Sequence, residues 1–362
     1  MVTPFESVYS DRRVFLTGHT GFKGSWMALW LEQLGSTVTG YALDPSTAPN
    51  HFDLLDFGLN SVIADLKEAD LLRAEMERAQ PEIVFHLAAQ PIVLRSYEDP
   101  VETFETNVLG TARLLEACRH VKSVKAVVVI TTDKCYENRE WVYGYRETDA
   151  LGGHDPYSAS KACTELVTAS FRKSFFDATS DREVLVASAR AGNVVGGGDW
   201  TEHRLVPDVM RAASESKPVQ IRNPRSSRPW QHVLEPLSGY LALGAKLLKG
   251  SEEFATAWNF GPAIESNLTT EQLFELMQRS WPEIQCEITP MESAPHEAGL
   301  LMLDSTKAQR ELDWRPVWGI EPTLHETVRW YRTYYEEQRA ISAQQIDQYV
   351  QCASSEGISW AQ

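Results

Sequence analysis

The segment that decides the fold reads Arg12-Arg13-Val14-Phe15-Leu16-Thr17-Gly18-His19-Thr20-Gly21-Phe22-Lys23-Gly24-Ser25-Trp26-Met27-Ala28-Leu29-Trp30-Leu31. The apolar run 14–16 is typical of a short buried strand, and apolar residues return at helical spacing after Phe22. Gly18, Gly21 and Gly24 lie across the turn between this strand and this helix. Such glycines permit a tight turn and the close approach of a pyrophosphate, which the N–H groups of the helix N-terminus can bind. The segment predicts a dinucleotide-binding unit; a plain strand–turn–helix is the alternative.

The composition bounds the class of protein and its partners. Hydrophobic residues make up 43% and charged residues 23% of the 362 positions, as in a globular protein large enough for two domains. The net charge of -16 argues against nucleic acid or an anionic membrane as a partner, because it repels phosphates. The five cysteines have neither metal-ligand nor paired spacing. With no signal peptide or long apolar run, we expect a cytoplasmic protein without a metal site.

Strands and helices alternate along the first half of the chain. Strands are predicted over 37–43, 61–64, 82–90, 124–132 and 183–190, and helices over 67–79, 101–119 and 157–176. This alternation predicts a parallel sheet covered on both faces, the Rossmann-type doubly wound α/β fold. A later strand over 257–261 is expected to return to the sheet, and 321–350 to form an amphipathic helical tail.

We therefore predict two domains. The dinucleotide-binding domain comprises residues 1–190 and 233–262. A smaller, discontinuous α+β substrate domain comprises residues 191–232 and 263–362.

The residue that ends the second predicted strand indicates the cofactor. Asp44 lies about 20 positions beyond the glycines, where a carboxylate holds a ribose 2′-hydroxyl. A turn aspartate is the alternative at this position. A carboxylate repels a 2′-phosphate, and no basic residue lies between Tyr41 and Asn50. The predicted cofactor is NAD rather than NADP.

Tyr157 and Lys161 lie four residues apart, on one face of a predicted helix. A free tyrosine has a pKa near ~10, so a base at neutral pH needs its pKa lowered by about three units, roughly 4 kcal/mol. A lysine one turn away and an oxidised nicotinamide can supply that lowering. Thr132, at the end of the fifth predicted strand, and the glycine turn favour a catalytic pair over a surface Tyr–Lys pair.

Three arginines, Arg222, Arg225 and Arg228, lie in a Pro/Ser-rich loop. In an acidic chain such a cluster favours a diphosphate ligand, because guanidinium groups bind phosphate oxygens bidentately. A solvated loop is the alternative.

These features together resemble the extended short-chain dehydrogenase/reductases that act on nucleotide sugars, from about residue 12 to residue 330. Asn107, in Thr106-Asn107-Val108-Leu109-Gly110-Thr111, belongs to the same pattern. Within the family, Asp133-Lys134 directly after Thr132 is similar to the acid–base pair of the nucleotide-sugar 4,6-dehydratases, which is commonly Asp-Glu.

Further motifs extend the resemblance: Gly18-His19-Thr20-Gly21-Phe22-Lys23-Gly24, Asp133-Lys134-Cys135-Tyr136, Gly197-Gly198-Asp199-Trp200 and Arg228-Pro229-Trp230-Gln231-His232-Val233. They imply CDP-glucose as the substrate. They also imply a place in deoxysugar biosynthesis for cell-surface polysaccharide, such as the lipopolysaccharide O-antigen.

The resemblance assigns roles residue by residue. The implied catalytic residues are Thr132, Asp133, Lys134, Tyr157 and Lys161. The implied cofactor-binding residues are Gly18, His19, Gly21, Phe22, Lys23, Gly24, Asp44, Asp65, Leu66, Leu87, Ala88, Ala89, Gln90, Asn107, Tyr157 and Lys161. The implied substrate-binding residues are Gln90, Thr132, Asn193, Arg204, Arg222 and Arg228. Relatives pair through the helices predicted over 101–119 and 157–176, which implies a homodimer or homotetramer.

The implied reaction is an oxidation and a reduction of the sugar with a dehydration between them. Tyr157 removes the proton of the 4-hydroxyl while Thr132 orients it, and hydride passes from carbon 4 to NAD. Lys134 then removes the proton of carbon 5, Asp133 protonates the departing 6-hydroxyl, and the hydride returns to carbon 6. The mechanism needs a neutral lysine beside a protonated aspartate, the reverse of their usual protonation states. Because their pKa values differ by ~6.5 units, this reversal costs about 9 kcal/mol in water. The mechanism therefore requires a dry pocket.

Two other functions are compatible with these motifs. An NAD-dependent nucleotide-sugar epimerase would use the same Tyr157 but return the hydride to carbon 4. A redox-sensing or scaffold protein would bind the dinucleotide without catalysis.

Overall fold

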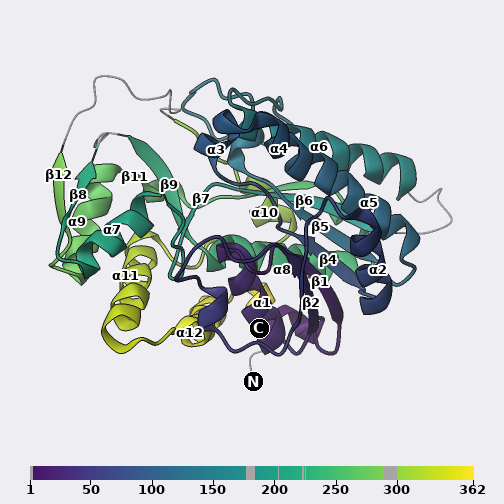
Figure 1. Cartoon of the computed structure of the whole chain (residues 1–362), viewed down its shortest axis with the longest axis horizontal. Coiled ribbons are helices and arrows are strands. Elements are labelled where there is room, and N and C mark those ends of the chain that lie inside the picture. The colour runs from purple at the N-terminus through teal and green to yellow at the C-terminus, as the bar shows by residue number, and fades with distance from the viewer. Residues whose placement is uncertain (1–2, 177–183, 203, 222–223, 225, 289–299) are drawn as a thin grey trace.

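A parallel sheet of seven strands forms the centre of the larger domain, in the order β10-β6-β5-β4-β1-β2-β3 (Figure 1). The strands are β1 (Arg13–Thr17), β2 (Thr37–Ala42), β3 (Asn60–Ile63), β4 (Ile83–His86), β5 (Ala126–Ile130), β6 (Leu185–Ala191) and β10 (Ala257–Phe260). All neighbouring pairs are parallel, and β10 joins the sheet beside β6. This computed structural model describes residues 3–176, 184–202, 204–221, 224, 226–288 and 300–362. The strand order confirms the doubly wound fold and places all the carboxyl ends at one edge.

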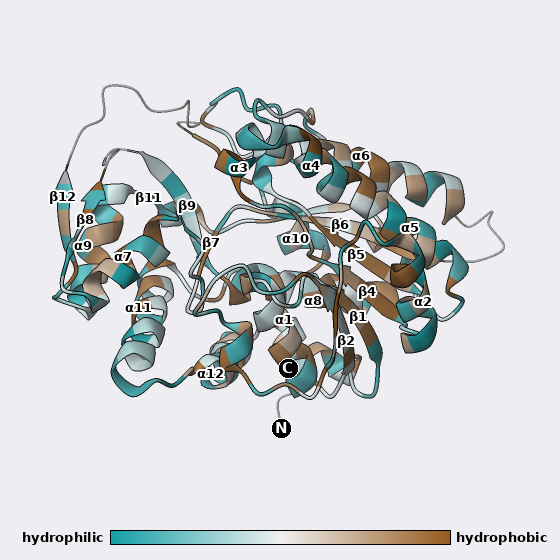
Figure 2. Ribbon diagram, in the orientation of Figure 1, coloured by the Kyte–Doolittle hydropathy of each residue, from teal (hydrophilic) through white to brown (hydrophobic). Residues whose placement is uncertain are grey.

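Helices cover both faces of the sheet, which is why its central strands are apolar throughout, as Figure 2 shows for β4 and β5. On one face lie α1 (Phe22–Gln33) and α8 (Leu234–Leu248), whose Trp26, Trp30 and Leu241 are buried in one core cluster. On the other lie α2 (Ala69–Ala79), α5 (Gly110–His120) and α6 (Pro156–Phe175), with Leu72 and Leu115 in a second cluster.

The smaller domain is α+β and is assembled from separate chain segments (Figure 1). Its strands are β7 (Asn193–Val195), β9 (Ser227–His232) and β11 (Asn267–Thr269) in one sheet, and β8 (Pro218–Ile221) and β12 (Gln285–Ile288) in another. Its helices are α7 (Leu205–Ser214), α9 (Thr270–Ser280) and α11 (Ile320–Glu337). The bounds given for the two domains stay a prediction.

The helical tail consists of two helices rather than a continuous one. α11 ends at Glu337, the following residue Gln338 has a left-handed φ of 53°, and α12 (Ser342–Ser355) comes next. The chain then returns to the N-terminus, where the ring of Trp360 stacks on that of Phe5, with their centroids 5.0 Å apart. The Trp360 ring also packs edge-on against Trp30, with a centroid distance of 6.0 Å. The last residues therefore pack on the larger domain, although the predicted division assigned them to the smaller one.

The helix predicted over 101–119 is also interrupted. α3 (Val93–Glu98) and α4 (Pro100–Phe104) are followed by a π-helical turn (Glu105–Leu109) and then by α5. The Asn107 carbonyl accepts hydrogen bonds from the hydroxyls of Thr111 (2.7 Å) and Thr164 (2.9 Å), which stabilise this wider turn. The remaining elements are α10 (Thr306–Glu311) and 3-10 turns at Pro4–Ser7, Phe52–Leu54, Asp133–Cys135, Glu252–Phe254, Ile264–Ser266 and Ser359–Ala361.

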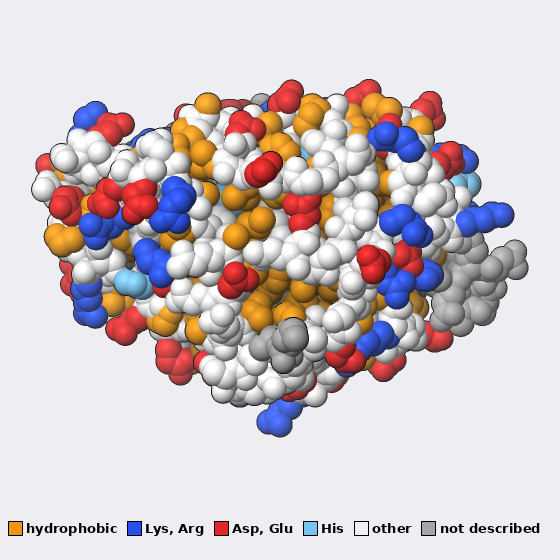
Figure 3. Space-filling view, turned by 90° about the horizontal axis from the view of Figure 1, so that it is seen from below, with side chains coloured by type: hydrophobic (Ala, Val, Ile, Leu, Met, Phe, Trp, Pro, Cys, Tyr) orange, Lys and Arg blue, Asp and Glu red, His pale blue; other side chains and the backbone are white. Residues whose placement is uncertain are grey.

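Charges of both signs are mixed on the face that Figure 3 shows, mostly around its rim. This mixture, with the net charge of -16, does not produce a basic surface on that face that would attract phosphates. Within the described residues, no helix has both the length and the apolar character that a membrane crossing requires.

The carboxyl group of Glu235, at the start of α8, is fully buried and ties this helix to the C-terminal region. It accepts hydrogen bonds from the backbone N–H groups of Val317 (2.9 Å) and Trp318 (2.7 Å) and from the Tyr349 hydroxyl (2.7 Å). Burial nevertheless raises the pKa of Glu235 from 4.5 to about 7, because the loss of hydration outweighs these donors.

We expect Glu235 to make the free energy of unfolding decrease as the pH rises from 4.5 to about 7. In this window the folded protein keeps a proton that the unfolded chain has released, so the stabilisation is complete at lower pH and is lost with rising pH. The shift corresponds to about 3 kcal/mol. Urea unfolding at a series of pH values measures the slope. Glu235→Gln should flatten it; an unchanged slope in Glu235→Gln would contradict the prediction.

Candidate active site

The turn between β1 and α1 has no room for side chains at two of its three glycines. Gly18 has a left-handed φ of 77°, and a Cβ there would lie 2.7 Å from the backbone nitrogen of Ala88. A Cβ on Gly24 would lie 1.9 Å from the carbonyl oxygen of Gly18. Gly21, in contrast, is exposed. The turn is therefore packed tightly on its inner side and open on its outer side, as a pyrophosphate cradle requires.

The residues predicted to bind the cofactor surround this turn. The Thr17 hydroxyl accepts a hydrogen bond from the N–H of Ala88 (3.1 Å), which holds the segment 87–90 beside the turn. Thr20 donates to the carbonyl of Leu43 (2.8 Å), directly before the exposed Asp44 at the end of β2. Asp65 and Leu66 follow β3 at the same edge. The first turn of α1 has no acidic residue and no side-chain cap, so its N–H groups suit a phosphate. These residues fit a dinucleotide such as NAD.

His19 lies over the adjoining strands. A Cβ on Gly40 would lie 2.3 Å from its ring, so the glycine in β2 makes room for the imidazole. The Nε2 atom lies 2.7 Å from the Ser61 hydroxyl in β3. Burial lowers the pKa of His19 to about 4, so the ring is neutral at neutral pH.

Gln90 and Asn107 use their side chains for contacts within the protein. The Asn107 Oδ1 atom accepts from the N–H of Gln90 (2.8 Å), and its Nδ2 donates to the Ser160 hydroxyl (2.8 Å). The Gln90 Nε2 donates to Thr103 (2.9 Å), and its Oε1 accepts from the N–H of Ile92 (2.6 Å). Both side chains therefore hold the segment 87–90 against α4 and α6.

The phenol of Tyr157 is buried beside Thr132, at the carboxyl end of β5. Burial raises the pKa of Tyr157 to about 12, whereas a hydrogen bond with Thr132 and the charge of Arg204 lower it. Lys161 instead donates to the carbonyl of Ile130 (3.1 Å), and burial lowers the pKa of its amine to about 8. The charge of Arg204 therefore acts on the phenol, and the role predicted for Lys161 stays a prediction.

Asp133 lies between two lysines. Its buried carboxylate accepts from the Thr132 hydroxyl (2.9 Å). Burial raises the pKa of Asp133, against the charges of the neighbouring Lys134 and Lys23. Lys23 extends from α1 over the ring of Tyr240 (6.0 Å to the centroid), and burial lowers its pKa to about 7, aided by Arg204 and Lys161. The resemblance assigned Lys23 to the cofactor alone, but its charge also acts on Asp133.

Apart from Gln90 and Thr132, the predicted substrate-binding residues come from the smaller domain and from the segment that leads into it. Asn193 begins β7 and follows Gly192, where a Cβ would lie 3.1 Å from the Asp133 carboxylate. Arg204 forms an ion pair with Asp199 (2.9 Å). Arg228 lies in β9, and its guanidinium donates to the Ser227 carbonyl (2.8 Å). Arg222 and Arg225 lie outside the described residues. Among the described residues, no group of three or more His, Cys, Asp or Glu side chains could hold a metal.

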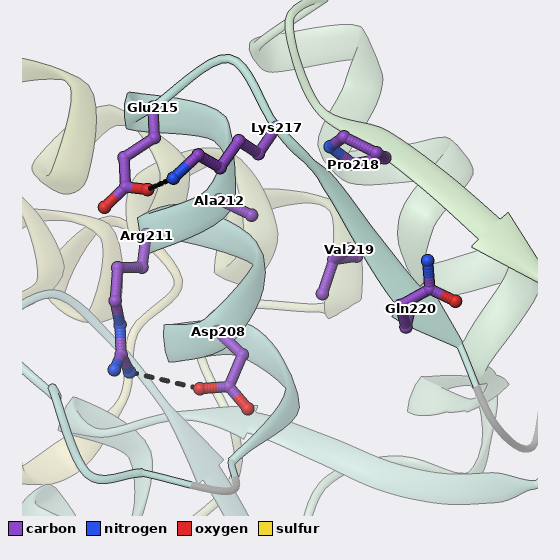
Figure 4. A pocket seen from close by; sticks show the side chains of 8 residues that line it. All are labelled: Asp208, Arg211, Ala212, Glu215, Lys217, Pro218, Val219 and Gln220. Atoms are coloured by element: carbon purple, nitrogen blue, oxygen red, sulfur yellow. Dashed lines mark hydrogen bonds and ion pairs between the residues drawn. The ribbon is translucent and has the colours of Figure 1, made fainter.

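A hollow of about 280 Å³ lies elsewhere, between α7 and β8 (Figure 4). Its charged side chains are paired, Arg211 with Asp208 (3.1 Å) and Lys217 with Glu215 (2.6 Å). Its lining does not include the glycine turn, the end of β5 or α6. It is therefore separate from the reaction centre.

Known proteins are similar to this chain in sequence and in fold. The sequence profile described as GDP-mannose 4,6 dehydratase matches residues 15–327. The chain belongs to this family. The CDP-glucose 4,6-dehydratase of Salmonella typhimurium is 47% identical over 351 residues, which are 95% of this chain and 98% of that protein. The resemblance seen in the motifs is thereby confirmed.

Solved structures reproduce the fold at lower identity. The epimerase Mth375 of Methanothermobacter thermautotrophicus has a TM-score of 0.80 at 22% identity, over 92% of this chain and 95% of that one. The UDP-glucose-4-epimerase of Stenotrophomonas maltophila, solved with bound NAD and formylated UDP-arabinopyranose, has a TM-score of 0.76 at 20% identity. It covers 90% of this chain and 99% of that one. Members of the GDP-mannose 4,6 dehydratase family and epimerases therefore share this architecture.

Proposed function

We propose that the protein is a lyase that converts CDP-D-glucose to CDP-4-dehydro-6-deoxy-D-glucose. NAD accepts hydride from carbon 4 of the sugar and returns it to carbon 6 within one turnover. The observation that carries the proposal is the position of Asp133 near the buried Tyr157, with Lys134 next to Asp133 in the same turn. A simple epimerase does not need this acid–base pair. The 47% identity to a CDP-glucose 4,6-dehydratase supports the same substrate.

The first half of the reaction depends on Tyr157. Its phenolate oxygen receives the proton of the sugar 4-hydroxyl, which Thr132 orients. The Thr132 hydrogen bond and the charge of Arg204 already lower the pKa of the phenol, against its burial. A positive charge bound at the carboxyl edge of the sheet would lower it further.

The second half depends on Asp133 and a neighbouring amine. Burial raises the pKa of Asp133, which favours the protonated form that an acid for the departing 6-hydroxyl needs. Lys134 removes the proton of carbon 5. The charges of Lys134 and Lys23 oppose the rise in the pKa of Asp133, so Asp133 can hold its proton only in a pocket that excludes water.

The cofactor is NAD rather than NADP. Asp44 is exposed at the end of β2, beside the glycine turn, where its carboxylate would repel a 2′-phosphate. The five cysteines have neither metal-ligand nor paired spacing, which supports our proposal that the enzyme acts in the cytoplasm, in the synthesis of deoxysugars for surface polysaccharide.

The purified protein should be incubated with NAD and a panel of nucleoside-diphosphate glucoses. We expect CDP-glucose to give a 4-keto-6-deoxy sugar, detected by NMR. A 4-epimer as the product would support the epimerase instead. If NAD bound and no sugar nucleotide turned over, a sensing or scaffold role would be supported.

Arg228 is proposed to bind the diphosphate of the substrate. Arg228→Ala should raise the KM for CDP-glucose ~30- to 150-fold, because a buried contact between charged groups contributes roughly 2–3 kcal/mol. The affinity for NAD, measured by titration, should change less than about two-fold, because the predicted NAD site lies on the larger domain. An unchanged KM would place Arg228 in solvent rather than against a phosphate.

We also propose that the protein is a homodimer or a homotetramer. α3, α4 and α6 expose apolar side chains that include Leu94, Tyr97, Val101 (75% exposed) and Leu166 (59% exposed). Removing such side chains from water favours association. Light scattering at micromolar concentration should give at least twice the monomer mass. Val101→Arg with Leu166→Arg should reduce it to the monomer mass, and Ile264→Arg, at an exposed apolar residue of the smaller domain, should not; a monomeric wild type would contradict the proposal.

A further inference from the structure

A buried ion pair lies directly behind the catalytic turn. The Arg190 guanidinium in β6 contacts the Glu165 carboxylate in α6 at 2.9 Å, and each side chain is only 3% exposed. Glu165 also accepts from the hydroxyls of Thr131 (2.5 Å) and Ser188 (2.6 Å). Buried charges need such additional partners, because the attraction between them repays their desolvation only in good geometry.

The ion pair holds the catalytic turn at both ends. Thr131, bonded to Glu165, directly precedes Thr132. Tyr136, which follows the 3-10 turn Asp133–Cys135, accepts a hydrogen bond from Arg190 (2.6 Å), whose guanidinium lies 4.9 Å from the centre of its ring. Thr132, Asp133 and Lys134 therefore lie in a short segment whose two neighbours are both bound to the same pair of charges.

The same pair connects the turn to the helix that carries Tyr157. Glu165 lies four residues after Lys161 and eight after Tyr157 on α6, so a shift of this helix would move the carboxylate that holds Thr131. Asn259, in β10, fixes Tyr136 from the other side. Its Oδ1 atom accepts from the Tyr136 hydroxyl (2.8 Å), and its Nδ2 donates to the carbonyls of Tyr145 (2.8 Å) and Asp304 (3.1 Å).

We propose that Glu165, Arg190 and Tyr136 are positioning residues for the elimination of water. Through Thr131 and Tyr136 they set the place of Asp133 and Lys134 relative to Tyr157. They thereby determine whether a sugar oxidised at carbon 4 loses water or keeps its 6-hydroxyl. This inference rests on the proposed 4,6-dehydratase reaction.

Tyr136→Phe tests the proposal with little disturbance of packing. The ring can keep its stacking on Tyr145 (5.1 Å) and its contact with Arg190, and only the hydrogen bonds of the hydroxyl are lost. In a single turnover with CDP-glucose, oxidation at carbon 4, followed by the absorbance of the reduced cofactor, should change less than about two-fold. Loss of water and exchange of the carbon-5 proton with deuterium should both fall roughly 10- to 100-fold, the effect of a misplacement near ~1 Å. A 4-keto hexose that keeps its 6-hydroxyl should accumulate.

Tyr9→Phe is the matched control. The Tyr9 hydroxyl is equally buried and donates to the carbonyl of Leu241 (2.6 Å), away from the catalytic turn. Both rates should stay at the wild-type value. Glu165→Gln, which removes the charge and keeps the shape, should also reduce elimination; oxidation is expected to fall with it, because Glu165 holds Thr131, the residue before Thr132. Its effect should not add to that of Tyr136→Phe, because both act on one network.

Equal reductions of oxidation and elimination in Tyr136→Phe would overturn the proposal and assign the network to stability alone. The proposal would also be overturned if, after oxidation, Tyr136→Phe eliminated water from the same fraction of the sugar as the wild type. The wild type is assayed in parallel. If it made no 4-keto product from any sugar nucleotide, the proposed function would fail, and this inference with it. If the wild type made the 4-keto product but Tyr136→Phe gave one of these two contradicting results, only the positioning proposal would fail.

Discussion

Tyr157→Phe should abolish oxidation at carbon 4, so that no absorbance of the reduced cofactor develops when CDP-glucose is added. The phenol is the group that takes the proton of the 4-hydroxyl, and phenylalanine has no atom to accept it. Loss of a general base typically costs ~10²- to 10⁴-fold. Stopped-flow absorbance with saturating NAD and substrate measures this step directly, without dependence on the later elimination.

Binding measurements provide the control for Tyr157→Phe. Titrations with NAD and with CDP-glucose should give dissociation constants close to those of the wild type, because the ring and its packing remain. Exchange of the carbon-5 proton should also disappear, since that proton becomes acidic only after carbon 4 is a ketone. Undiminished oxidation would mean that another group takes the proton and that Tyr157 only shapes the pocket.

Lys134→Met should separate the two halves of the reaction. Oxidation should remain possible, while elimination falls by at least the ~10²- to 10⁴-fold of a missing base. The cofactor should then accumulate partly in its reduced form, beside a 4-keto hexose that keeps its 6-hydroxyl. NMR of the sugar and carbon-5 exchange in deuterium oxide measure the two steps.

Lys23→Met is the informative comparison for Lys134→Met. Both amines act on the charge of Asp133, and burial lowers the pKa of Lys23 to about 7, so a large fraction of this amine is neutral at neutral pH. If Lys134 is the base, Lys23→Met should reduce elimination much less than Lys134→Met does. Normal carbon-5 exchange in Lys134→Met with its loss in Lys23→Met would assign the base to Lys23. Normal carbon-5 exchange in both variants would mean that another group or a water molecule is the base.

The local sequence was sufficient to predict the sheet, the turn and the carboxyl edge. The all-apolar β5 and the run before Gly18 predicted buried parallel strands, because only strands covered on both faces are apolar throughout. The glycine spacing predicted a turn without room for side chains, and the Cβ positions at Gly18 and Gly24 agree. Element bounds were less predictable: the π-helical turn at Asn107 depends on hydroxyl groups of Thr111 and Thr164, and Thr164 lies in another helix.

The sequence by itself determined the fold class, the family resemblance, and which residue types stand at the ends of the strands. Each of these depends on residues that are close together in the chain. Only the tertiary structure decided that the charge of Lys23 acts on Asp133, that the charge of Arg204 acts on the phenol of Tyr157, and that Tyr349 of α12 packs on Trp30 of α1. Likewise, only the folded chain brings Arg190 to Glu165 and Asn259 to Tyr136. The physical reason is that burial and the electrostatic interaction between charges depend on distance in space, and folding places residues far apart in the sequence within a few ångströms of one another.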